Sequence, residues 1–309
     1  MRRREAEMKG IEISGISRSY GEVNALNDVT LSVENGELFG LIGPDGAGKS
    51  TLYRILATLL LPDKGAARIE GLDVVKDFRR VRTLIGYMPE RFSLYQDMTV
   101  KENLKFFASL FGADIKESYD LIAPVFRQLE RFPNRKAGAL SGGMKQKLAL
   151  SCALIHRPHV LLLDEPTTGV DAVSRSEFWE MLSGLKEHGI TILVSTSYMD
   201  EANLCQRIAM IDKGCILATG SPSELAARTD ENLFEARAEE MFRLLAALRE
   251  MPDVINCYTF GATIHIVARD DFSPARAAAR LESQGLYGVS VRPAKGTIED
   301  LFIKYDSMR

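Results

Sequence analysis

One eight-residue segment has the residue types and spacing of a phosphate-binding loop. Its sequence, Gly43-Pro44-Asp45-Gly46-Ala47-Gly48-Lys49-Ser50, fits the pattern G-x-x-x-x-G-K-[ST]. A buried strand is predicted over residues 38–42 and a helix over 51–56. The chemistry requires that context, because glycines let backbone N–H groups turn toward phosphates and the helix N-terminus adds positive potential. We expect Lys49 to reach the β- and γ-phosphates of a nucleotide and Ser50 to ligate Mg²⁺, with Thr51 completing the cofactor-binding set.

Two adjacent carboxylates end a second apolar run. Residues 160–163 read Val-Leu-Leu-Leu, which predicts a buried strand, and Asp164-Glu165 follow directly. Alone, such a pair is commonly a solvated strand end. In a chain with a phosphate-binding loop, Asp164 is predicted to hold Mg²⁺, and Glu165 is the candidate general base for a water that attacks the γ-phosphate.

A third motif indicates the class of phosphate-binding protein. The segment Leu140-Ser141-Gly142-Gly143-Met144-Lys145-Gln146-Lys147 resembles the LSGGQ-type signature of ATP-binding cassette (ABC) proteins, and it lies between the other two motifs as it does in that family. The resemblance runs from about residue 10 to 225. It implies an α/β P-loop NTPase cassette with a RecA-like core, an antiparallel β subdomain and a helical signature subdomain. It also implies that Ser141, Gly142 and Gly143 close on ATP held by a second cassette.

The resemblance assigns further positions. Tyr20 matches the aromatic residue that stacks on adenine, and Asp171, in Gly169-Val170-Asp171, matches the D-loop aspartate at the subunit interface. The segment Phe92-Ser93-Leu94-Tyr95 matches the region where such cassettes meet the membrane subunit. The amino-acid sequences of the phosphate loop, of residues 91–100 and of residues 296–302 are most similar to those of multidrug and related exporter cassettes. In such exporters the permease subunits are separate chains.

Two positions depart from the family pattern. The Q-loop position, usually glutamine, is Glu90, which can still ligate Mg²⁺ but cannot donate a hydrogen bond. The switch position, usually histidine, is Ser197, which is too short to reach the γ-phosphate except through a water. Two hypotheses therefore stay open: a working ATPase subunit in a homodimer or heterodimer, or a degenerate cassette that binds ATP and regulates a partner with little hydrolysis of its own.

Composition limits the possible partners. The net charge of -3 gives no reason to expect nucleic acid as a partner. The basic start, Met1-Arg2-Arg3-Arg4, leads into no apolar stretch, and no run approaches the roughly 18 apolar residues that would span a bilayer. Together with this, the resemblance to exporter cassettes implies a cytoplasmic protein, peripheral on the inner face of the membrane, whose permease is a separate chain.

The sequence changes character beyond the cassette. We assign residues 1–225 to the ATP-binding domain and 226–309 to a small α+β accessory domain, for which a ferredoxin-like fold is one candidate. Helices are predicted around 241–248, after Ser273-Pro274 and over 298–305, and strands over 254–260, 263–267 and 289–291, the first two joined by Gly261-Ala262. Regulation, dimer contacts and simple packing all remain possible roles for this domain.

Overall fold

The computed structural model describes residues 9–229 and 232–307. The basic start therefore lies outside the described residues. The chain divides into two compact units between Ser221 and Pro222, whereas the sequence analysis placed its boundary between 225 and 226. The difference is helix α7 (Pro222–Ala226), which belongs to the second unit because it packs against helix α10 (Ile298–Ser307).

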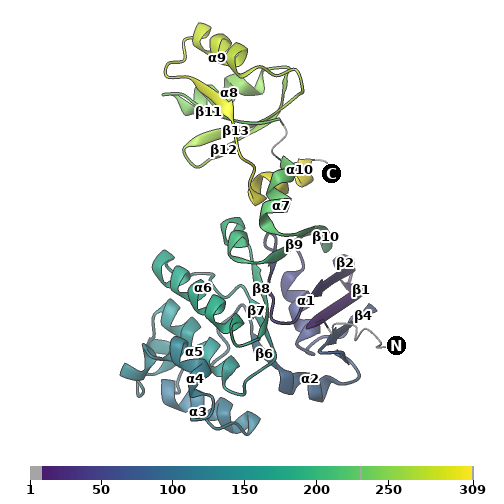
Figure 1. Cartoon of the computed structure of the whole chain (residues 1–309), viewed down its shortest axis with the longest axis vertical. Helices are drawn as coiled ribbons and strands as arrows, with labels where there is room; N and C mark the ends of the chain where they lie inside the picture. The colour runs from purple at the N-terminus through teal and green to yellow at the C-terminus, as the bar shows by residue number, and fades with distance from the viewer. Residues whose placement is uncertain (1–8, 230–231, 308–309) are drawn as a thin grey trace, which may run out of the picture. The chain divides into compact units, whose positions relative to one another are not determined.

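A six-stranded sheet forms the centre of the first unit (Figure 1). Its order is β10-β9-β3-β8-β7-β6, parallel except for β10, which runs antiparallel to β9. Strands β3 and β7 are buried at every residue, as their continuous apolar runs predict. The strand bounds are β3 Leu38–Ile42, β6 Ile85–Met88, β7 Val160–Asp164, β8 Thr191–Thr196, β9 Arg207–Asp212 and β10 Cys215–Gly220.

A second, antiparallel sheet packs against helix α1 (Lys49–Leu56) and the central sheet through one apolar core. The order is β2-β1-β4-β5. The strands are β1 (Ile11–Tyr20), β2 (Val23–Val33), β4 (Lys64–Ile69) and β5 (Leu72–Asp73), followed by helix α2 (Phe78–Leu84). The core that the two sheets share fixes the phosphate-binding loop between them.

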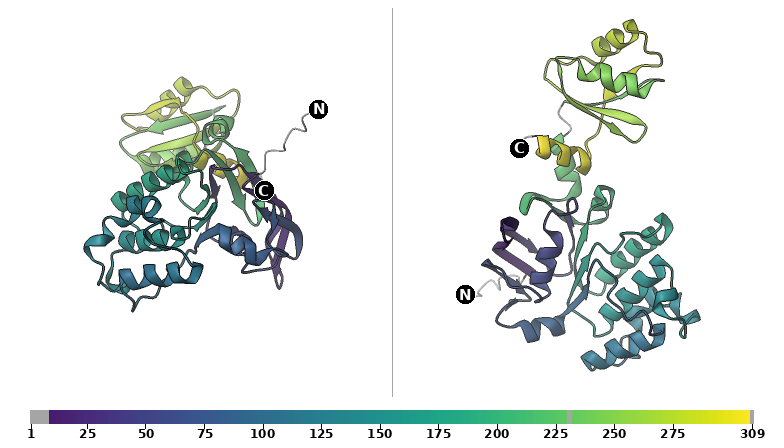
Figure 2. Two further views of the ribbon diagram at one scale, coloured as in Figure 1. Left: turned by 60° about the horizontal axis from the view of Figure 1, so that its bottom comes forward. Right: turned by 180° about the vertical axis from the view of Figure 1, so that it is seen from behind.

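Helices form the third part of this unit, on the other side of the central sheet from β1 and β2 (Figure 2). They are α3 (Val100–Phe111), α4 (Tyr119–Phe126), α5 (Gly142–Leu154) and α6 (Ala172–Lys186), with short 3-10 turns at Leu129–Arg131, Ala137–Ala139 and Met199–Leu204. No helix among the described residues is long and apolar enough to cross a membrane.

Helix α3 departs in part from what its apolar spacing predicts. The spacing of Leu104, Phe107, Leu110 and Phe111 predicts one packed face, and Leu104 is buried, but Leu110 is 63% exposed and Phe111 is also exposed. The face that packs instead includes Asn103, whose side chain accepts from the Tyr95 backbone N–H at 3.1 Å. A polar residue that fixes a neighbouring turn therefore takes a place that periodicity assigns to an apolar one.

The second unit has the element order β11-α8-β12-β13-α9-β14, followed by α10, and the sheet order β12-β13-β11-β14. This is the β-α-β-β-α-β arrangement of ferredoxin-like domains. Its last strand begins at Ser290, one residue later than predicted. The bounds are β11 Leu233–Arg237, α8 Met241–Arg249, β12 Val254–Phe260, β13 Thr263–Ala268, α9 Pro274–Ser283 and β14 Ser290–Pro293, with a 3-10 turn at Ala227–Thr229.

A buried polar cluster joins α10 to the sheet of this second unit. Asp300 accepts hydrogen bonds from Tyr258 and Thr297, and its carboxylate lies 2.6 Å from Nδ1 of His265. Burial alone would raise the pKa of Asp300, but the hydrogen bonds from His265, Thr297 and Tyr258 hold that pKa below its usual value.

Candidate nucleotide site

The phosphate-binding loop joins the end of β3 to the start of α1, as predicted. A Cβ on Gly48 would lie 2.3 Å from the Ala25 carbonyl oxygen, and the residue has a φ of +104°. A Cβ on Gly43 would lie 2.1 Å from the carbonyl oxygen of Ile211. Only glycine fits at these two positions, and the backbone N–H groups at the start of α1 are left to face a ligand.

Lys49 is held inside this loop. Its Nζ donates to the carbonyl oxygens of Gly43 at 2.5 Å and Pro44 at 2.9 Å. It also forms an ion pair with Oε1 of Glu165 at 3.0 Å, and both side chains are almost fully buried. The fold thus brings the lysine of the first motif into contact with the second carboxylate of the acidic strand end.

Asp164 is buried beside a serine that the sequence analysis missed. The hydroxyl of Ser195 donates to Asp164 Oδ1 at 2.8 Å and accepts from the Glu165 backbone N–H at 2.9 Å. Burial raises the pKa of Asp164, hydrogen bonds from Ser195 and Ser50 lower it, and the charge of Glu90 raises it further. The parallel register pairs Asp164 with Ser195, and this pairing of distant segments has no local sequence signal.

Glu165 sits at a backbone φ of +49°, a conformation that is costly for a residue with a side chain. Its Oε2 accepts from the Thr168 hydroxyl at 3.1 Å, from the Ser197 backbone N–H at 3.2 Å and from the Ser197 hydroxyl at 3.4 Å. Sequence reasoning singled out Ser197 for its distance from the phosphate. It did not anticipate the contact with Glu165, and it missed Thr168.

The signature lies at a helix start, as expected. Ser141 caps α5, and its hydroxyl accepts from the Met144 backbone N–H at 3.4 Å. Asp171 caps α6 in the same way, accepting from the Ser174 N–H at 3.0 Å. A Cβ on Gly143 would lie 2.6 Å from the Ser174 hydroxyl oxygen, so these two helix starts lie side by side.

Sequence comparison gives the family of this site. The pattern of the family described as "ABC transporter" matches residues 26–168. The "Probable multidrug ABC transporter ATP-binding protein YbhF" of Escherichia coli is 38% identical over 221 residues, which are 71% of this chain but 38% of that protein. The "Nod factor export ATP-binding protein I" of Bradyrhizobium diazoefficiens is 35% identical over 301 residues, which are 95% of each chain. The chain belongs to the ABC transporter ATP-binding proteins.

Solved structures agree with this assignment. An "ATP binding subunit of ABC transporter" matches the cassette with a TM-score of 0.64 and 31% identity, over 71% of this chain and 92% of that one. A dimeric cassette bound to ADP and Pi in a post-hydrolysis state matches with a TM-score of 0.61 and 26% identity, over 68% and 98%. The cassette thus has the fold of proteins that bind and hydrolyse ATP. None of these relatives supports a degenerate cassette.

Glu90 and Tyr20, two of the predicted site residues outside the phosphate loop, the acidic strand end, the signature and the D-loop, are exposed. Glu90 follows β6, which pairs in parallel with β7. Glu90 therefore lies at the same end of the sheet as Asp164. Tyr20 ends β1 and is 44% exposed, with the guanidinium of Arg18 5.3 Å from its ring centroid. Arg18 in turn donates to Asp63 at 2.5 Å, which fixes it beside the ring.

One cavity of the cassette is apolar. It has a volume of about 540 Å³ and lies between the segment after β6 and helices α3 and α5. Its walls include Phe92 and Leu94 from the segment predicted to meet a membrane subunit, together with the exposed Leu110 and Phe111 of α3. Leu110 and Phe111, which do not pack inside the cassette, therefore line this cavity.

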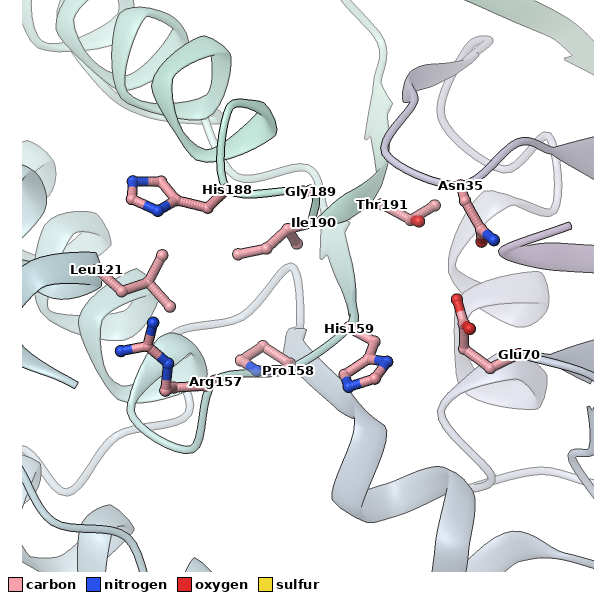
Figure 3. Close-up of a pocket in the computed structure, with 10 residues that line it drawn as sticks. All are labelled: Asn35, Glu70, Leu121, Arg157, Pro158, His159, His188, Gly189, Ile190 and Thr191. Atoms are coloured by element: carbon pink, nitrogen blue, oxygen red, sulfur yellow. The ribbon is translucent and has the colours of Figure 1, made fainter. Parts of the chain in front are cut away.

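Another cavity lies at the opposite edge of the central sheet from the phosphate loop (Figure 3). It has a volume of about 410 Å³, and His159, His188 and Glu70 line it beside the amino-terminal ends of β7 and β8. Neither histidine can therefore replace the missing switch histidine at residue 197. Among the described residues, no group of three or more His, Cys, Asp and Glu side chains could hold a metal ion.

Proposed function

We propose that the chain is the MgATP-hydrolysing subunit of an ABC exporter and that it drives a permease carried on separate chains. The observation that supports this most directly is the meeting of Lys49, Asp164 and Glu165 at the phosphate-binding loop. A cation, a metal-ligating carboxylate and a base are thereby placed at one helix N-terminus, which is the set that phosphoryl transfer to water requires.

The residues present fit ATP and Mg²⁺. The loop leaves the backbone N–H groups at the start of α1 facing a ligand, and it packs so closely on the Ala25 carbonyl that Gly48 has no room for a Cβ. The oxygens of Ser50 and Asp164 are the hard ligands that Mg²⁺ prefers, and Glu90 is a further carboxylate nearby. Bound Mg²⁺ would neutralise charge on the β- and γ-phosphates.

The chain's own residues account for the proton in this reaction. Glu165 takes a proton from the attacking water while the water oxygen forms a bond to the γ-phosphorus. The bond between the γ-phosphorus and the oxygen that it shares with the β-phosphorus breaks, which gives ADP and phosphate. For this, Lys49 exchanges its contact with Glu165 for the phosphate oxygens. Since Glu165 is retained and donors hold it in place, we expect turnover despite Ser197.

We also propose that two cassettes close around two ATP molecules, as a homodimer or a heterodimer. Tyr20 would stack on adenine, and Ser141, Gly142 and Gly143 would contact the ATP of the opposing subunit, with Asp171 at the interface. The exposure of Tyr20 and the paired starts of α5 and α6 support these roles. A dimeric structure among the cassettes of this fold supports the stoichiometry.

The apolar cavity supports the partner assignment. We propose that an apolar segment of the permease docks there, which would place the chain on the inner face of the membrane. We expect Leu110→Asp to abolish co-purification with the permease while the isolated chain keeps its ATP turnover. Leu61 has the same 63% exposure but does not line the cavity, so Leu61→Asp is the matched control. Equal retention of the permease by both variants would refute the docking site.

The first experiment measures MgATP turnover by the purified chain against Glu165→Gln. We expect phosphate release by the wild type and a loss of at least about 100-fold in the variant, because the variant lacks the base. Binding of ATP by both proteins, with hydrolysis by neither, would refute the assignment as a hydrolysing subunit.

A further inference from the structure

The two carboxylate oxygens of Glu165 have different surroundings. Oε2 accepts three hydrogen bonds, from the Thr168 hydroxyl and from the N–H and hydroxyl of Ser197. Oε1 accepts no hydrogen bond from the described residues, although it is buried, and its ion-pair partner is Lys49 at 3.0 Å. Hydrogen bonds therefore fix only Oε2, whereas Oε1 is held by its ion pair with Lys49 alone.

Rigid elements fix both hydroxyl groups. Thr168 lies on the turn directly after Glu165, and its backbone N–H donates to the Glu165 carbonyl oxygen at 3.3 Å. Ser197 follows the last residue of β8, which pairs in register with β7. Ser195 bonds the Glu165 backbone N–H, so the peptide of the base and the strand that carries Ser197 are joined directly.

This asymmetry determines which oxygen can take a proton. Three donors occupy the acceptor sites of Oε2, so that oxygen has little capacity left for a water molecule. Lys49 is shared between Oε1 and the loop that receives the phosphates. When the phosphates take over Lys49, Oε1 becomes the acceptor available to a water.

We propose that Ser197 and Thr168 are positioning residues that together fix Oε2 of Glu165 and leave Oε1 as the oxygen that accepts the proton. Ser197 thus acts on the base, and its side chain does not need to reach the γ-phosphate. The inference rests on the proposed function, since it concerns the geometry of the same base.

The test compares steady-state ATP hydrolysis by the full-length wild type, Ser197→Ala, Thr168→Val and the double variant. We expect each single substitution to lower kcat by about 10-fold, the lower end of the range for groups that orient a functional residue. KM for ATP should change by less than about twofold, because both hydroxyls donate to Glu165 and the inference gives them no contact with the nucleotide. The double variant should lose much less than the product of the single losses, because both hydroxyls hold one oxygen.

A conservative variant separates positioning from simple folding effects. Ser197→Thr keeps the hydroxyl and should keep kcat within about threefold of the wild type. Unchanged kcat in both Ser197→Ala and Thr168→Val would overturn the inference while leaving the ATPase assignment intact. A raised KM with unchanged kcat in Ser197→Ala would also overturn it, because Ser197 would then contact the nucleotide. Absence of Glu165-dependent turnover in the wild type would instead reject the proposed function, and this inference with it.

Discussion

The buried ion pair between Lys49 and Glu165 opposes nucleotide binding, because the phosphate oxygens and the Glu165 carboxylate compete for the same ammonium group of Lys49. At 3.0 Å and an effective dielectric constant of about 20, the attraction between the two charges is about 5–6 kcal/mol. Lys49 also donates to the carbonyl oxygens of Gly43 and Pro44, and desolvation offsets much of the gross attraction between Lys49 and Glu165. We expect a net effect of about 1–2 kcal/mol on phosphate binding. Glu165→Gln should therefore bind an ATP analogue about 5- to 30-fold more tightly than the wild type.

Isothermal titration with a non-hydrolysable ATP analogue measures this difference without interference from turnover. Glu70→Gln is the matched control, since it makes the same chemical change at the opposite edge of the sheet (Figure 3). Its affinity should equal that of the wild type. Equal or weaker binding by Glu165→Gln would show that Glu165 does not compete with the phosphates for Lys49.

Three further predictions concern other parts of the chain. Tyr20→Ala should weaken ATP binding by about 1–3 kcal/mol, the range for stacking on a base, while leaving the affinity for tripolyphosphate unchanged in the same titration. Gly48→Ala should abolish ATP binding, because its Cβ would meet the backbone of Ala25. Gly46→Ala has open space at its Cβ and should cost only about 1 kcal/mol of stability, because its φ is positive. Retained ATP binding in Gly48→Ala would show that the loop conformation does not require glycine there. Because the pKa of Asp300 is lowered in the folded chain, it contributes stability that is present above its unfolded pKa of about 4 and is lost as pH falls through the lower folded value. Urea unfolding between about pH 3 and 6 should therefore show an acid-dependent loss that is smaller in Asp300→Asn, and equal slopes in the two proteins would contradict this.

Motifs that are contiguous in sequence could be predicted closely. The strand before Gly43 has the predicted bounds, and the strand that ends at Asp164 begins at the predicted residue and extends one residue further. Short apolar runs bounded by glycine or carboxylates can form few other structures. The helix after Ser273 was also predicted, since a serine cap followed by proline is a local signal.

Contacts made by tertiary pairing could not be predicted in this way. Ser195 and Thr168 received no role because their importance comes from the register of β7 and β8 and from the turn after Glu165. Leu110 was assigned to a packed face because a 3.6-residue period shows which residues share a side. It does not show whether that side meets the core or a cavity.

The place of Arg18 beside Tyr20 has a consequence for the choice of nucleotide. The guanidinium of Arg18 lies by the Tyr20 ring and is held there by Asp63. A base that stacks on Tyr20 therefore meets an aromatic face with a positive charge beside it. Any purine presents such a face, and stacking does not read the groups on its edge. A cassette that recognises its base in this way would accept guanosine and adenosine triphosphates with similar affinity, and the nucleotide it uses would be set by which one is more abundant around it.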